Sequence, residues 1–135
     1  LKGLPKTDLE TLQKNVTSTE YESGSKIIQL NEKADGIYFL RSGKVSVMVG
    51  DGIYVSGLDA GTCFGELALI APDATRTANI IADTKVFCSF LSIKAFNEIS
   101  LVNPSFNELL LRNLGLILFE RLKQSNSKII ALSAN

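Results

Sequence analysis

The stretch Lys44-Val45-Ser46-Val47-Met48-Val49-Gly50-Asp51-Gly52-Ile53-Tyr54-Val55 decides the fold class. Its first half alternates in polarity, which is typical of a strand with one face turned to a core. The two glycines that follow suit a tight turn, because glycine adopts a positive φ at little cost. The sequence therefore predicts a short β-hairpin around residues 50–52.

The same pattern of short apolar runs broken by glycine extends from Tyr21 to Phe90. Seven or eight short strands at this spacing predict a mainly β fold, either a jelly roll or a small barrel. The runs expected to form strands are Ile27–Leu30, Ile37–Leu40, Val45–Val49, Ile53–Val55, Thr62–Phe64, Ala78–Ala82 and Val86–Leu91.

A helix is predicted before the β region, over Leu4 to Val16. Thr7 and Glu10 have the spacing of a capping box, in which each side chain satisfies a backbone N–H near the helix start. Apolar residues recur three and four positions apart, so we expect one face to dock on the core: Leu9, Leu12 and Val16.

Two helices are predicted after the β region. Ser92 can cap the first, which runs through Ile99, and Asn103-Pro104 begins a longer helix that extends to about Lys128. The apolar residues of the long helix cover well over half its circumference, so one contact surface cannot bury them. The helix either packs only on its own barrel or also pairs with a second copy of itself, and we favour the homodimer.

The composition narrows the function classes. The chain has 135 residues, 14 basic and 14 acidic, which suits one domain and disfavours a polybasic nucleic-acid surface. It has no histidine, which excludes Ser-His-Asp and Cys-His nucleophile systems and histidine-ligated metals. We therefore expect no enzyme and no metal site.

Cysteine content and apolar runs bear on the compartment. Cys63 and Cys88 lie in strand-like stretches and are expected to be reduced and buried. No signal peptide opens the sequence, and no apolar run approaches the roughly 20 residues that span a bilayer. We expect a cytoplasmic domain, or the cytoplasmic part of a membrane protein. Because residue 1 is Leu and the only methionine is Met48, we also expect a longer parent protein.

The stretch from Phe64 to Ala78 carries the chemistry. Gly65 lets the chain leave a strand, and residues 66–69 can form one helical turn, which Pro72 ends. The start of such a turn favours an anion, and Arg76 can return to it with a guanidinium that donates two parallel hydrogen bonds to a phosphate. Glu66 would repel that anion unless it binds a ribose hydroxyl, so phosphate and ribose together indicate a nucleotide.

Gly65-Glu66-Leu67-Ala68-Leu69, followed by Arg76-Thr77-Ala78, resembles the phosphate-binding cassette of the cyclic nucleotide-binding domains. The resemblance covers nearly the whole chain and implies a β jelly roll (a double-stranded β-helix) with a short N-terminal helix and a C-terminal helical lid. It implies a single domain over residues 1–135, divided into an N-terminal segment at 1–20, a jelly roll at 21–91 with the cassette at 64–78, and C-terminal helices at 92–130.

The resemblance also implies roles for the cassette residues. Glu66 would bind the ribose 2′-hydroxyl, and Arg76 the exocyclic oxygens of the cyclic phosphate. Thr77 would bond the phosphate through its hydroxyl and its amide, and threonine here is similar to the cyclic-GMP-responsive members. The full set of expected ligand-binding residues is Gly65, Glu66, Leu67, Ala68, Arg76, Thr77 and Ala78. The ligand would be cyclic AMP or cyclic GMP, with no further cofactor.

The implied function is that of a sensor domain, which transmits a change in its lid to an attached domain or partner. The alternative is a degenerate jelly roll that only dimerises and binds no nucleotide. A cupin-type metalloenzyme would need histidine ligands that are absent. Few residues follow the long helix, so a DNA-binding helix-turn-helix is not expected. The C-terminal stretch resembles regulatory domains attached to bacterial transporters and glutaminases.

Overall fold

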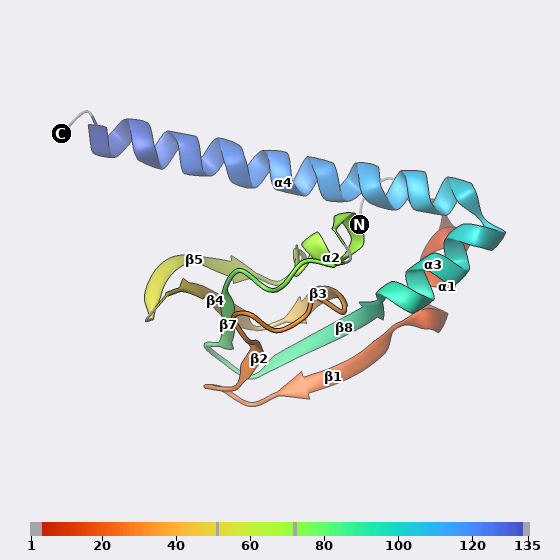
Figure 1. The fold of residues 1–135 in the computed structure, drawn as a ribbon, viewed down its shortest axis with the longest axis horizontal. Helices are drawn as coiled ribbons and strands as arrows, with labels where there is room; N and C mark the ends of the chain where they lie inside the picture. Colours follow the sequence, from red (N-terminus) through yellow and green to blue (C-terminus); the bar gives the residue numbers. More distant parts are fainter. Residues whose placement is uncertain (1–3, 51, 72, 134–135) are drawn as a thin grey trace.

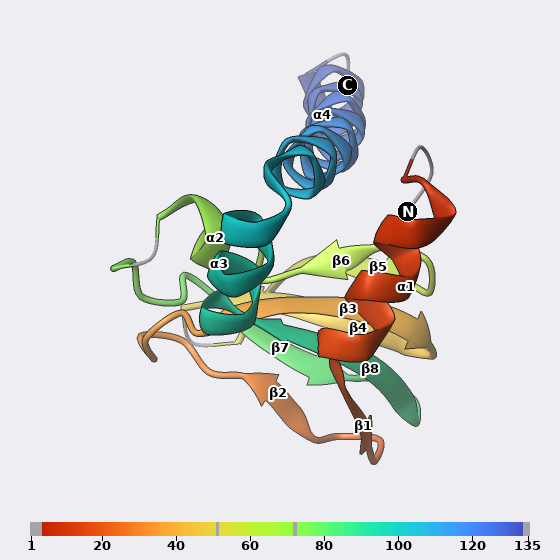
Figure 2. The same ribbon diagram turned by 90° about the vertical axis from the view of Figure 1, so that its right-hand side faces the viewer.

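A computed structural model describes residues 4–50, 52–71 and 73–133, with side chains up to Gln124. It forms two four-stranded antiparallel sheets, in the orders β1-β8-β3-β6 and β2-β7-β4-β5 (Figures 1 and 2). The strands are β1 (Thr17–Tyr21), β2 (Lys26–Ile28), β3 (Gly36–Ser42), β4 (Lys44–Val49), β5 (Ile53–Asp59), β6 (Cys63–Phe64), β7 (Asn79–Ala82) and β8 (Val86–Ser92). The predicted mainly β class with flanking helices is confirmed.

The strand pattern of the sequence agrees closely with the structure. All seven predicted runs overlap strands, and the hairpin between β4 and β5 places Gly50 and Gly52 at φ values of +57° and +84°. Asp51 at its tip lies outside the described residues. The sheet begins at Thr17 rather than at Tyr21, because β1 pairs with β8 as an edge strand. The residues of β1 show no alternation in burial, so the sequence pattern did not predict this strand.

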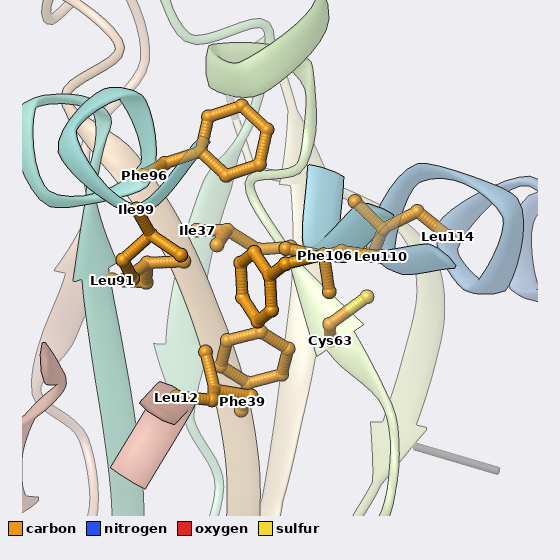
Figure 3. Close-up of a cluster of buried hydrophobic side chains, with 10 residues drawn as sticks. All are labelled: Leu12, Ile37, Phe39, Cys63, Leu91, Phe96, Ile99, Phe106, Leu110 and Leu114. Atoms are coloured by element: carbon orange, nitrogen blue, oxygen red, sulfur yellow. The ribbon is translucent and has the colours of Figure 1, made fainter. Parts of the chain in front are cut away.

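Alternation along the strands produces two apolar clusters, one on each face of the first sheet. The outer face packs against the helices (Figure 3), and the inner face packs against the second sheet. On β3, Ile37 and Phe39 belong to the outer cluster, whereas Leu40 belongs to the inner one. The jelly-roll core therefore has two layers, and the helices are held on the outer one.

Helix α1 (Lys6–Asn15) docks as its apolar stripe predicts, because Leu12 is buried in the outer cluster and Val16 packs against it. The predicted capping box is wrong. Pro5 is the N-cap residue and no side chain caps the helix, so Thr7 lies inside the first turn. Proline has neither a side-chain acceptor nor an N–H, so an N-cap proline can form neither bond of a capping box.

The two C-terminal helices begin where the sequence predicts. Ser92 caps α3 (Ile93–Val102) by accepting a 3.0 Å hydrogen bond from the Ala95 amide. Asn103 precedes α4, which spans Pro104–Ser133 and so runs past the predicted end near Lys128. No helix among the described residues is both long enough and apolar enough to cross a membrane.

Helix α4 buries only one of its apolar faces. Phe106, Leu110 and Leu114 are at most 1% exposed in the outer cluster (Figure 3). Other apolar side chains on the same helix stay exposed to solvent: Leu111, Leu116, Phe119 and Leu122. The expectation that one contact surface cannot bury all of them is confirmed.

The two cysteines provide a test of the packed core. Cys63 and Cys88 are free thiols, each 1% exposed, and burial is the main cause that raises the pKa of each to about 11. Because the thiolate is the reactive form, we expect labelling by a thiol reagent at pH 8 to be at least about a hundredfold slower in the folded protein than in urea. Equal rates in both conditions would contradict the burial.

The raised pKa of the two thiols makes the stability of the fold decrease at high pH. Folded-state pKa values above those of the unfolded thiols mean that the unfolded chain releases protons first as the pH rises. This contribution to stability is therefore complete below about pH 9 and is lost as the pH approaches 11. A variant with both cysteines replaced by alanine should lose less stability between these pH values in urea melts.

Candidate functional site

The predicted cassette folds as a tight turn followed by a short helix. Strand β6 ends at Phe64, Gly65 takes a φ of +74°, and α2 spans Leu67–Ile70. A Cβ atom at Gly65 would lie 2.8 Å from Arg76 Nη1, a distance that real Cβ contacts do not reach. Glycine is therefore required here both for the backbone conformation and for the approach of the arginine. Pro72, predicted to end the helical turn, lies outside the described residues.

Backbone pairing with the segment after β2 delivers Arg76 to this turn. The Arg76 amide donates to the Glu32 carbonyl at 2.7 Å, and the Arg76 carbonyl accepts from the Asn31 amide at 2.9 Å. Asn31 has a φ of 72°, so a left-handed residue forms the turn that makes this pairing possible. The cassette thus depends on a loop that is 45 residues earlier in the chain than Arg76 (76 − 31).

The Arg76 side chain is 6% exposed and its orientation is fixed by three hydrogen bonds. Nη1 donates to the Gly65 carbonyl at 2.9 Å, and Nη2 donates to Asp35 Oδ1 at 2.9 Å and to the Gly36 carbonyl at 2.8 Å. A guanidinium has five N–H donors. Two of them, at Nε and Nη1, have no protein acceptor within the described ranges.

These donors lie beside a cavity of about 180 Å³. Four backbone amides that line it also make no hydrogen bond within the described part of the chain: those of Glu66, Leu67, Thr77 and Ala78. Unpaired amides together with a buried guanidinium form a site that favours an anion. The opposite wall is apolar and suits a flat organic group: Ile28, Val47, Leu58, Phe64 and Ile80.

The structure brings together six of the seven residues expected at the site, since all of them except Ala68 line this cavity. Ala68 is fully buried behind the turn, and its amide donates to the Gly65 carbonyl at 3.3 Å. Thr77 is an exposed residue that lines the cavity.

Sequence reasoning missed Arg121, which also lines the cavity. Helix α4 passes above α2 (Figure 1), and Arg121 Nη1 lies 3.2 Å from Glu66 Oε1. Arg121 Nη2 donates to Thr62 Oγ1 at 2.8 Å and also to the Cys63 carbonyl. Arg121 gives no local signal in the sequence, because its contact with Glu66 joins residues 55 positions apart.

The profile of the family described as "Cyclic nucleotide-binding domain" matches residues 18–102 of this chain. The chain belongs to this family. Solved structures share its jelly-roll fold: a cyclic nucleotide-binding domain from Methylobacillus flagellatus superposes with a TM-score of 0.88 at 19% identity, covering 97% of this chain and 76% of the other. The catabolite activator protein of Thermus thermophilus gives 0.76 at 22% identity, covering 98% and 62%.

Curated relatives place the same domain within longer proteins. Glutaminase 1 of Bradyrhizobium diazoefficiens is 36% identical over 134 residues, which is 99% of this chain but 22% of that protein. The cAMP-activated global transcriptional regulator CRP of Escherichia coli O157:H7 is 30% identical over 133 residues, 94% of this chain and 61% of the regulator. This chain therefore spans about a fifth of the length of the glutaminase relative.

Proposed function

We propose that this domain binds a cyclic nucleotide, cyclic AMP or cyclic GMP, and passes its binding state to an attached domain or partner. The observation that carries the proposal is the buried Arg76 guanidinium, which keeps unused donors at a cavity also lined by Glu66. Burying a cation costs free energy unless partners satisfy its donors. A bound anion would satisfy the donors that Arg76 leaves unused. Binding changes no bond in the ligand, so the domain acts as a sensor.

Each cassette group has one role in this proposal. Arg76 and the unpaired amides of the turn hold the exocyclic oxygens of the cyclic phosphate. Glu66 accepts a hydrogen bond from the ribose 2′-hydroxyl, and the apolar wall covers the base. Thr77 lines the cavity, and its hydroxyl binds the phosphate, with a reach that also suits cyclic GMP.

Arg121 supplies the link between ligand and lid. Its side chain joins α4 to Glu66, which is the group that the ribose would engage. A ligand that changes the position of Glu66 therefore changes the contacts of α4, and it shifts the lid equilibrium only by its difference in affinity for the two lid positions. We infer that α4 transmits the signal.

The glutaminase relatives bear on what this domain is attached to. We propose that residues 1–135 act as one regulatory domain in the cytoplasm, attached to an effector that glutaminase relatives exemplify. Two free, buried cysteines support a reducing compartment.

Calorimetric titration with cyclic AMP and with cyclic GMP tests the function. We expect saturable 1:1 binding of at least one of them, with 5′-AMP as a control that lacks the cyclic phosphate. Absence of binding by either cyclic nucleotide at millimolar concentration would overturn the sensor and leave the alternative, a jelly roll that only dimerises.

Pairing of α4 with a second copy is a separate prediction. The exposed apolar side chains of α4 form a face that a homodimer would cover. Light scattering at micromolar concentration should give the mass of a dimer, and Leu122→Glu should shift the population to monomer because it places a charge in the interface. Gln124→Glu, which adds the same charge at a neighbouring exposed polar position of α4, should remain dimeric. A monomer at every concentration of the wild-type chain would exclude the pairing.

A further inference from the structure

A second cavity lies between α1 and the outer face of the first sheet. Its volume is about 260 Å³, larger than that of the cassette cavity, and the two cavities share no lining residue. One wall is formed by α1 and the residue that follows it, with spacings of three, one and three residues: Leu9, Leu12, Gln13 and Val16. The facing wall includes Phe39 of β3. The lining is therefore largely apolar, and it contains none of the residues expected to bind the nucleotide.

The polar end of this cavity is formed by two strands of the sheet. Arg41, at the end of β3, donates from Nη1 to Ser89 Oγ on β8 at 3.1 Å, and Ser89 is only 3% exposed. Ser89 lies directly opposite Phe39 in the strand register. The Ser89 hydroxyl accepts from Arg41, so its own proton is available to a further acceptor.

The charge at this end is uncompensated. Arg41 is the one ionisable residue that lines the cavity, and within the described residues it forms no ion pair. A guanidinium next to a buried hydroxyl, with no carboxylate on the wall, suits a singly charged anion with planar oxygen acceptors. A dianion would require a second cation that the wall does not supply.

We propose that this cavity is a second ligand site, for a small monocarboxylate with a short apolar body. The carboxylate binds Arg41 and Ser89, and the apolar body lies between the α1 stripe and Phe39. The volume falls just below the roughly 300–1,000 Å³ typical of sites for drug-sized ligands, so the body is short. The site shares no lining residue with the cassette cavity and needs no bound nucleotide.

An NMR titration of the ¹⁵N-labelled chain with sodium hexanoate tests this site, with sodium chloride matching the ionic strength. We expect saturable shifts of the Thr62 and Ser89 amides, both at the cavity wall. Hexan-1-ol has the same apolar body without the charge, and it should bind about tenfold more weakly or worse. Cyclic AMP added to the same sample should leave the hexanoate shift of Ser89 in place, whereas the Thr62 amide can also respond to the nucleotide because Thr62 Oγ1 accepts from Arg121.

Two variants make the test specific. Arg41→Gln should weaken hexanoate binding by about tenfold or more, and Ser89→Ala should weaken it by a smaller factor. Arg112→Gln is the matched control, because Arg112 is exposed on α4 and forms an ion pair with Glu108 on the same helix, away from this cavity. Arg41 is exposed, so its replacement leaves the fold intact. Equal affinity for hexanoate and hexan-1-ol, no saturable shift, or unchanged binding by Arg41→Gln would each overturn the proposal.

Discussion

Replacing Arg76 with alanine should lower the affinity for cyclic AMP and cyclic GMP by about a hundredfold or more. The guanidinium is 6% exposed, and among the described residues only Arg76 and Arg121 bring a positive charge to the cassette cavity. Removing a buried, charge-assisted bond to a phosphate costs more than removing an exposed one, because water cannot replace it. Isothermal titration of the variant and the wild type measures the ratio of dissociation constants.

Two further variants separate ligand binding from loss of fold. Arg76→Lys keeps the charge but loses the planar donors, so we expect binding that is intermediate between wild type and Arg76→Ala. Arg112→Ala makes the same truncation at an exposed position on α4 and should bind as wild type does. If Arg76→Ala binds either cyclic nucleotide with unchanged affinity while its thermal melt stays cooperative, the assignment of Arg76 is wrong.

Replacing Leu110 with alanine should destabilise the chain by about 3 kcal/mol, within the 2–5 kcal/mol typical of buried Leu→Ala changes. Leu110 is 0% exposed in the cluster that joins α4 to the first sheet (Figure 3). The cost combines lost apolar burial with a cavity that the packed neighbours cannot close. Urea unfolding followed by circular dichroism measures the change in the free energy of unfolding.

Leu101→Ala provides the matched control, because this leucine lies on α3 and is 84% exposed. The same atoms are removed there from solvent rather than from a core, so the expected change is within about 0.5 kcal/mol. Similar losses for the two variants would mean that α4 does not dock on the sheet as the structure has it.

The strands and both C-terminal helices could be predicted because their signals are local. Glycine between short apolar runs, the Ser92 cap and the Asn103-Pro104 start each depend on residues within a few positions of one another. The capping box at Thr7 failed for a local reason too, since the N-cap is Pro5, two residues earlier. Strand β1 was missed because an edge strand with mostly exposed side chains has no alternating pattern.

The cassette itself was predictable, because Gly65, Glu66 and Arg76 lie within 12 residues (65 to 76) and their types suit a phosphate and a ribose. The sequence therefore predicted the fold class, and it predicted six of the residues that the structure brings to one cavity. The surroundings of these residues became apparent only in the folded chain: Asp35 and Gly36 fix the Arg76 guanidinium, Arg121 reaches Glu66 from α4, and Arg41 donates to Ser89 beneath α1. The physical reason is that these contacts join residues 40 to 55 positions apart, whose side chains meet only after the strands have paired and the helices have docked.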